Sequence, residues 1–135
     1  MANQLSQIKW VRVILTAIVV YIASFLAITL IVTGYASVIA FQARGAPDQE
    51  LINAFANQYA PWIGPISLIL FTFLGARHVA RRVDTAIQTN GIAVGVLASL
   101  IDLIVEGARS FGLISVLTMI LTIGAAWLGS RTVQK

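Results

Sequence analysis

Two acidic residues interrupt a long apolar stretch in the second half of the chain. Asp102 and Glu106 are four residues apart, so on a helix they lie one turn apart on the same face. An acid inside a bilayer is costly and normally faces a protein interior, where it binds a cation or relays a proton. Two such carboxylates also repel each other, so we expect at least one to be uncharged at neutral pH. Both residues are therefore candidates for binding a proton or a cation.

The same pair also admits a structural interpretation. If the helix begins at the inner membrane edge near Gly91, Asp102 lies about 16 Å into a hydrocarbon core of about 30 Å, close to its middle. If the helix begins nearer residue 86, Glu106 reaches the outer interface and pairs with Arg109, three residues further on. Asp102 then hydrogen-bonds to a Ser or Thr of a neighbouring helix.

A basic cluster follows the second apolar stretch. Arg77, Arg81 and Arg82 are candidates for contacts with anionic lipid headgroups, which are attracted by about 1 kcal/mol per nearby cation. The simpler interpretation is that these charges only fix the orientation of the chain in a membrane. The single histidine, His78, has no second His, Cys or carboxylate at ligand spacing, so we predict no metal site.

Sequence signatures of enzymes are absent. The chain contains no G-x-S-x-G or H-E-x-x-H motif and no Gly-rich phosphate loop. It also has no cysteine, which excludes a disulfide scaffold and a cysteine nucleophile. We therefore expect a non-enzymatic protein without a ligated cofactor. A pigment, quinone or lipid held by packing alone remains open.

The composition indicates a membrane protein. Of the 135 residues, 59% are hydrophobic and only 10% are charged, against about 25% charged in a soluble domain. With this composition and a net charge of +4, we expect no nucleic-acid partner. A lipid bilayer is the expected environment, and the whole chain, residues 1–135, is expected to form one integral membrane domain.

Four stretches with few charges are long enough, or nearly so, to cross a bilayer, which takes about 20 helical residues. The first is far too long for the apolar core of a secretory signal, so we expect it to be retained as a helix. The predicted fold is an all-α bundle of four transmembrane helices, over residues 12–42, 61–80, 88–107 and 111–130.

An outer loop is expected over residues 43–60. Residues 46–50 resemble a helix start, because proline suits a first turn and acids there favour the helix dipole. A short separate helix is predicted to follow, either lying in the headgroup plane or capping the bundle.

The basic residues predict the orientation. With four crossings, seven of the nine Lys and Arg residues fall on one side of the membrane and two on the other. By the positive-inside rule, both termini and the 81–87 loop are cytoplasmic. The small size of the chain and the lack of a transit peptide suggest a bacterial plasma (inner) membrane.

Small residues recur at helical spacing in the last two spans. Gly91 and Gly95 belong to one such stripe, while Gly124 and Gly129 lie in the fourth span. Small residues let helix backbones approach closely in lipid, so we predict packing contacts at these glycines, either within the chain or between copies.

Two functions are compatible with this pattern. The favoured one is a structural or accessory subunit that packs against copies of itself or against a larger membrane complex. The alternative is a small oligomeric transporter or channel in which Asp102 and Glu106 bind a proton or a cation.

Overall fold

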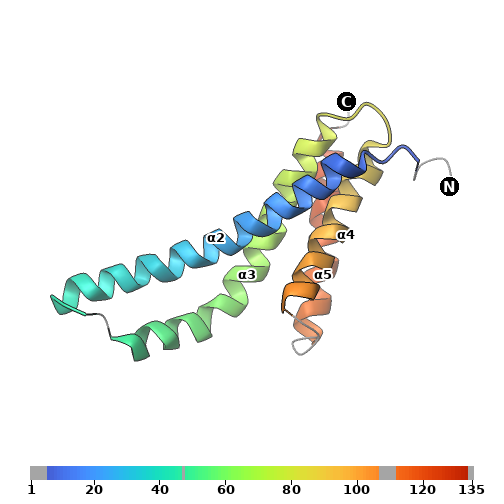
Figure 1. The fold of residues 1–135 in the computed structure, drawn as a ribbon. Helices are drawn as coiled ribbons and strands as arrows, with labels where there is room; N and C mark the ends of the chain where they lie inside the picture. Colours follow the sequence, from blue (N-terminus) through green and yellow to red (C-terminus); the bar gives the residue numbers. More distant parts are fainter. Residues whose placement is uncertain (1–5, 47, 107–111, 134–135) are drawn as a thin grey trace.

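The computed structural model describes residues 6–46, 48–106 and 112–133, and it is all helical, without a strand, over these ranges. Each of its four helices is long and apolar enough to cross a membrane, which confirms that part of the prediction. The helices, shown in Figure 1, are α2 (Trp10–Ala43), α3 (Gln49–Ala80), α4 (Ile87–Glu106) and α5 (Leu113–Arg131).

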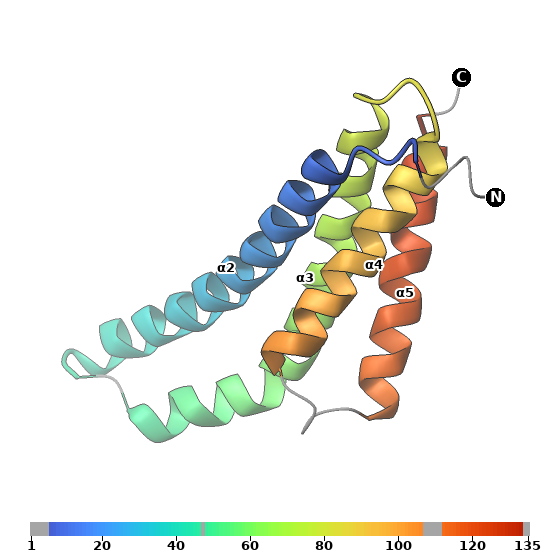
Figure 2. The same cartoon turned by 45° about the vertical axis from the view of Figure 1, so that its right-hand side comes forward.

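The four helices form a bundle at only one end of the molecule. There, α3 packs against α2, α4 and α5, and α2 also contacts α4. The rest of α2 and the beginning of α3 project together from the bundle and are joined by a turn at the end farthest from it (Figures 1 and 2). We call this projecting helix pair, residues 25–66, the arm.

The arm has no fully buried side chain among its described residues. The last buried residue of α2 is Ser24, and the first buried residue of α3 is Ser67. The two helices of the arm are joined by an aromatic stack in which the rings of Tyr35 and Phe55 are 3.9 Å apart. Tyr59 extends the stack, with its ring 4.7 Å from that of Phe55.

The predicted outer loop over residues 43–60, with its own short helix, differs from the structure. A helix does start where expected, because the Asp48 side chain accepts hydrogen bonds from the main-chain N–H groups of Glu50 and Leu51. It does not end before the second span, however, and continues through Pro61 and Pro65 to Ala80. A proline inside a helix removes one hydrogen bond and bends the helix without necessarily ending it, and α3 bends visibly in Figure 2.

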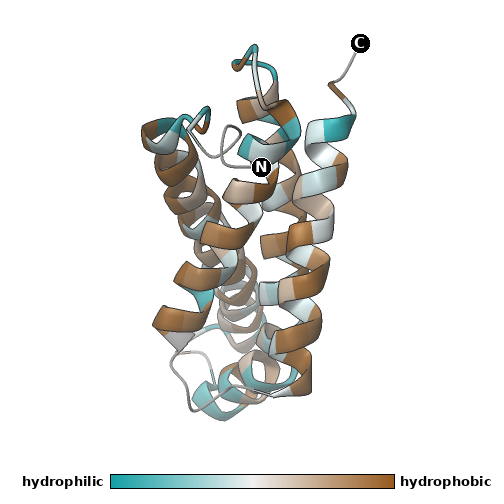
Figure 3. Ribbon diagram, turned by 90° about the vertical axis from the view of Figure 1, so that its right-hand side faces the viewer, coloured by the Kyte–Doolittle hydropathy of each residue, from teal (hydrophilic) through white to brown (hydrophobic). Residues whose placement is uncertain are grey.

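The bundle interior is built from small and hydroxyl-bearing side chains. Val13, Val79 and Val94 are fully buried in one apolar cluster, and a second cluster contains Ala17, Val20, Leu68 and Ala98. Many large apolar side chains are instead exposed on the outside of the helices. In Figure 3, brown segments of apolar residues recur along the helical ribbons. This distribution suits helices that meet through close backbone contact and face an apolar surrounding.

Candidate functional site

Asp102 lies beside a small cavity between α4 and α5. The cavity has a volume of about 20 Å³, which is enough for one water molecule or one small monovalent ion. It is lined by three apolar and four oxygen-bearing side chains: Leu68, Ser99, Asp102, Leu103, Ser115, Thr118 and Met119.

The four oxygen-bearing residues come from two facing helices with the same spacing. Ser99 and Asp102 are three residues apart on α4, and Ser115 and Thr118 are three residues apart on α5. Residues at this spacing share a helix face, so each helix presents two oxygen donors to the same space. A carboxylate with three hydroxyl oxygens is a donor set suited to a hard cation or to a bound water.

Two of the hydroxyl groups have capacity to bind a ligand. Ser99 is 7% exposed, and its Oγ is buried without a hydrogen-bond partner among the described residues. The Thr118 hydroxyl donates its proton to the carbonyl oxygen of Ile114 at 2.9 Å, so its oxygen can only accept further bonds or coordinate a cation. A buried hydroxyl without a partner costs about 1–3 kcal/mol, which a bound water or ion would offset.

A larger cleft adjoins this cavity on the side of the arm. Its volume is about 630 Å³, and Asp102, Ser115 and Thr118 line both spaces. The arm contributes Asn57 and Pro61, among other residues, to the opposite wall. Asp102, which is half-buried, therefore stands between a narrow oxygen-lined cavity and a wide cleft.

The second predicted acid, Glu106, is the last residue of α4. Its proposed ion-pair partner, Arg109, lies outside the described residues, so this structural alternative stays a prediction.

The predicted packing glycines occupy two kinds of position. A Cβ added at Gly91 would lie 2.4 Å from Ser130 Cβ, and one at Gly95 would lie 2.6 Å from Ala126 Cβ, so both face α5 within the same chain. A Cβ at Gly129 would meet the carbonyl oxygen of Phe73 in α3. At Gly124, an added Cβ would meet no atom of the described chain within 4 Å.

The predicted basic residues lie at the end of α3, where residues from the start of the chain join them. Arg77 is half-buried, while Arg81 and Arg82 are exposed. The guanidinium of Arg12, at the beginning of α2, donates a hydrogen bond to the main-chain carbonyl of Arg82. Arg12 is missing from the predicted site because 70 residues separate it from Arg82. The predicted topology could have indicated this contact, because it puts Arg12 and Arg82 on the same side of the membrane.

Within the described ranges, no three His, Asp or Glu side chains gather as metal ligands would. Comparison with family models, with curated protein sequences and with solved structures found no match to this chain.

Proposed function

We propose that this chain is an integral membrane protein that acts as a non-enzymatic assembly subunit. It uses the arm to pack against copies of itself or against a larger membrane complex. The observation that carries this proposal is the lack of any fully buried side chain among the described residues of the arm, although the arm contains about half of each of the two longest helices.

The physics of helix packing in lipid supports an interaction role for the arm. Apolar side chains gain little from leaving lipid tails, so helices are held together by close backbone contacts and polar bonds. The bundle has such contacts at Gly91, Gly95 and Gly129. Within the arm, the rings of Tyr35 and Phe55 stack across the two helices, and Ile28 of α2 lies close to Gly64 of α3, but none of these side chains is fully buried. A neighbouring protein would supply the missing contacts.

The proposed topology places the basic end of the bundle in the cytoplasm of a bacterial cell. The start of α2, the turn between α3 and α4, and the end of α5 lie together at one end of the molecule (Figure 1). The basic residues near these points, including Arg12, Arg82 and Arg131, favour that side under the positive-inside rule. The turn of the arm would then lie toward the outer face of the plasma membrane.

Cysteine cross-linking tests the role of the arm directly, because the natural chain has no cysteine. Leu30→Cys places a thiol on the arm, where Leu30 is 70% exposed, and Leu121→Cys places a matched thiol on α5, where Leu121 is 49% exposed. Each variant is labelled with benzophenone maleimide and irradiated in native membranes, where the excited ketone bonds to a neighbouring C–H group of any protein. We expect a cross-linked product from Leu30→Cys and none from Leu121→Cys.

The mass of the product identifies the neighbour. A product at twice the chain mass indicates a second copy, and a larger product carries a peptide of the partner that mass spectrometry can identify. Equal cross-linking at the two positions, or none at either, would contradict an interface at the arm.

A second function is favoured by the cavity at Asp102. A carboxylate, the unpartnered Ser99 hydroxyl and the Thr118 oxygen around a space of about 20 Å³ would suit a transported proton, carried on water, or a sodium ion. The adjoining cleft of about 630 Å³ would give one access route. Under this proposal the chain is a small proton- or cation-coupled transporter or channel.

Ion flux distinguishes the two functions. In proteoliposomes, a transporter produces proton or sodium flux that Asp102→Asn abolishes, whereas a subunit produces none. Asp84→Asn is the matched control, because Asp84 is an exposed residue of the turn after α3. Loss of flux in both variants, or flux that persists in Asp102→Asn, would rule out a role for the Asp102 carboxylate in transport.

A further inference from the structure

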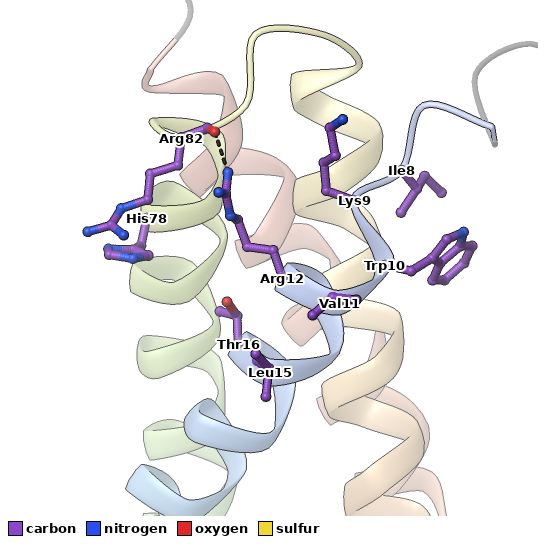
Figure 4. Close-up of a pocket in the computed structure, with 9 residues that line it drawn as sticks. All are labelled: Ile8, Lys9, Trp10, Val11, Arg12, Leu15, Thr16, His78 and Arg82. Atoms are coloured by element: carbon purple, nitrogen blue, oxygen red, sulfur yellow. Dashed lines mark hydrogen bonds between the residues drawn. The ribbon is translucent and has the colours of Figure 1, made fainter.

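A groove runs between the beginning of α2 and the end of α3, and it changes character along its length. Its upper part, shown in Figure 4, is a cavity of about 690 Å³ with three obligate cations and one histidine in its wall. Its residues are Ile8, Lys9, Trp10, Val11, Arg12, Leu15, Thr16, His78 and Arg82. None of these described lining residues is acidic, so the charge of the upper groove has no counter-ion in its own wall.

The lower part of the groove is apolar. A second cavity, of about 410 Å³, shares Leu15, Thr16 and His78 with the first and continues between the same two helices. Apart from the three shared residues, its wall contains only apolar side chains and one glycine: Val19, Val20, Ala23, Phe71, Leu74 and Gly75. The two cavities therefore form one continuous groove that is cationic at the end of the bundle and apolar below.

Hydrogen bonds fix both sides of the cationic part. The main-chain N–H of Lys9 donates to Asn90 Oδ1 at 2.8 Å, which ties the start of α2 to α4. Asn90 is fully buried, and its amide nitrogen donates to the carbonyl oxygen of Ala86 at 2.9 Å. The Arg12 guanidinium bonds to the main chain of Arg82 across the groove, as the dashed line in Figure 4 shows. The walls are thus positioned by bonds that leave the Lys9 and Arg82 side chains available.

We propose that this groove binds one anionic phospholipid, with its headgroup at the cationic end that Lys9, Arg12 and Arg82 line and one acyl chain along the apolar part. Only an amphiphile with a negative headgroup matches both halves, because a free anion leaves the apolar part empty and a neutral lipid leaves the cations unpaired. Arginine and lysine are the side chains that bind phosphate, and the aromatic ring of Trp10 suits the headgroup level of a bilayer. The proposal rests on the membrane location proposed above, but not on the arm.

Trp10 provides a direct probe, because it lines the cationic cavity. The chain has three tryptophans, so substituting Trp62 and Trp127 by Phe leaves Trp10 as the only one. In this variant, bromine atoms on a nearby lipid quench the fluorescence of Trp10. The quenching is compared between vesicles of dioleoyl phosphatidylglycerol and of dioleoyl phosphatidylcholine, each containing some of the brominated form of the same lipid. We expect the groove to bind phosphatidylglycerol about tenfold or more tightly than phosphatidylcholine, because two or more cations lie near the headgroup.

Two double variants with the same change in charge separate the groove from general surface charge. Lys9→Gln with Arg82→Gln removes two groove cations while keeping both main-chain bonds, and should reduce the preference to about twofold or less. Arg81→Gln with Arg131→Gln removes two exposed cations that do not line the groove, and should keep the preference. Circular dichroism and size-exclusion chromatography in detergent check that all variants are folded.

Three outcomes would overturn the proposal. Equal quenching by the two lipids would show that the groove has no headgroup preference, and an equal loss in both double variants would assign the preference to surface charge. Displacement of phosphatidylglycerol by inorganic phosphate, but not by chloride at matched ionic strength, would make a free anion the ligand. Because cross-linking at Leu30 uses none of the groove residues, failure of the arm interface and failure of the lipid site are separate results.

Discussion

Gly95 stands at a close contact between α4 and α5 that tolerates no added atom. A Cβ there would lie 2.6 Å from Ala126 Cβ and 3.2 Å from the main-chain Cα of Ile123. Since one of these neighbours is backbone, the clash cannot be relieved by a side-chain rotation alone. Gly124, on α5, is the opposite case, because an added Cβ meets no described atom within 4 Å.

We expect Gly95→Ala to lower the free energy of unfolding by about 1–3 kcal/mol, because overpacking forces the helices apart. This loss should exceed the gain of up to about 1 kcal/mol from the better helix propensity of alanine. Unfolding in mixed micelles with increasing dodecyl sulfate, followed by circular dichroism, measures the difference. Gly124→Ala is the control and should leave the protein unchanged or slightly more stable. A Gly95→Ala variant as stable as the natural chain would mean that the two helices do not pack this closely.

The residues of the candidate site differ in how visible they are in the sequence. Asp102 is conspicuous because a charge inside an apolar run is rare and costly. Ser99 and Thr118 are not conspicuous, because hydroxyl side chains are common in apolar helices and often bond to their own backbone, as Thr118 does. Which hydroxyls face a carboxylate depends on the rotation of two helices about their axes, and no local pattern fixes that rotation.

At the scale of elements, the helix start expected over residues 46–50 and the helix end expected at residue 80 agree with the structure. The expected end at 107 and start at 111 lie outside the described residues. Asp48 begins α3 through its side-chain cap, and the run of polar residues after Ala80 ends it. The arm is the exception. Whether a helix stops at Pro61 or bends and continues depends on contacts with other parts of the chain. One such contact is the ring stack of Tyr35 with Phe55, which a local sequence pattern cannot predict because the two residues are on different helices.

The prolines of α3 should control the direction of the arm. We expect replacement of both Pro61 and Pro65 by Ala to straighten α3, because each substitution restores a main-chain donor and removes a ring clash. Spin labels at Leu51→Cys and Leu113→Cys, read by pulsed electron resonance, report the separation of the arm from α5. Straightening should change the separation of these labels by about 5 Å or more, given the length of α3 beyond the bend.

A label pair at Leu113→Cys and Leu128→Cys is the control, because both residues lie on α5 and their separation should not change. An unchanged distance between the arm and α5 would mean that contacts of α2, rather than the prolines, set the bend.

At the scale of the whole molecule, the two ends of the bundle differ in charge because distant segments meet at one of them. Lys9 bonds to Asn90 across 81 residues, and Arg12 bonds to Arg82 across 70. The number of helices and their order could be predicted from apolar runs, but these long-range bonds could not. They join the first basic residues of the chain to α4 and to the turn after α3, so that charges from separate segments lie at the same end of the bundle.

This distribution of charge predicts which end faces the cytoplasm, and labelling in intact bacterial cells tests it. Ala46→Cys marks the exposed turn of the arm, while Asp84→Cys and Thr132→Cys mark the basic end. We expect an impermeant maleimide to label only Ala46→Cys in intact cells and the other two only after permeabilisation, because the basic end is retained inside. Asp84→Cys removes an acid from the basic end, so the substitution cannot weaken the positive charge that is expected to keep this end in the cytoplasm. The reverse labelling pattern would show that the basic end faces the outside of the cell. Labelling of Asp84→Cys and Thr132→Cys from opposite sides would exclude four crossings.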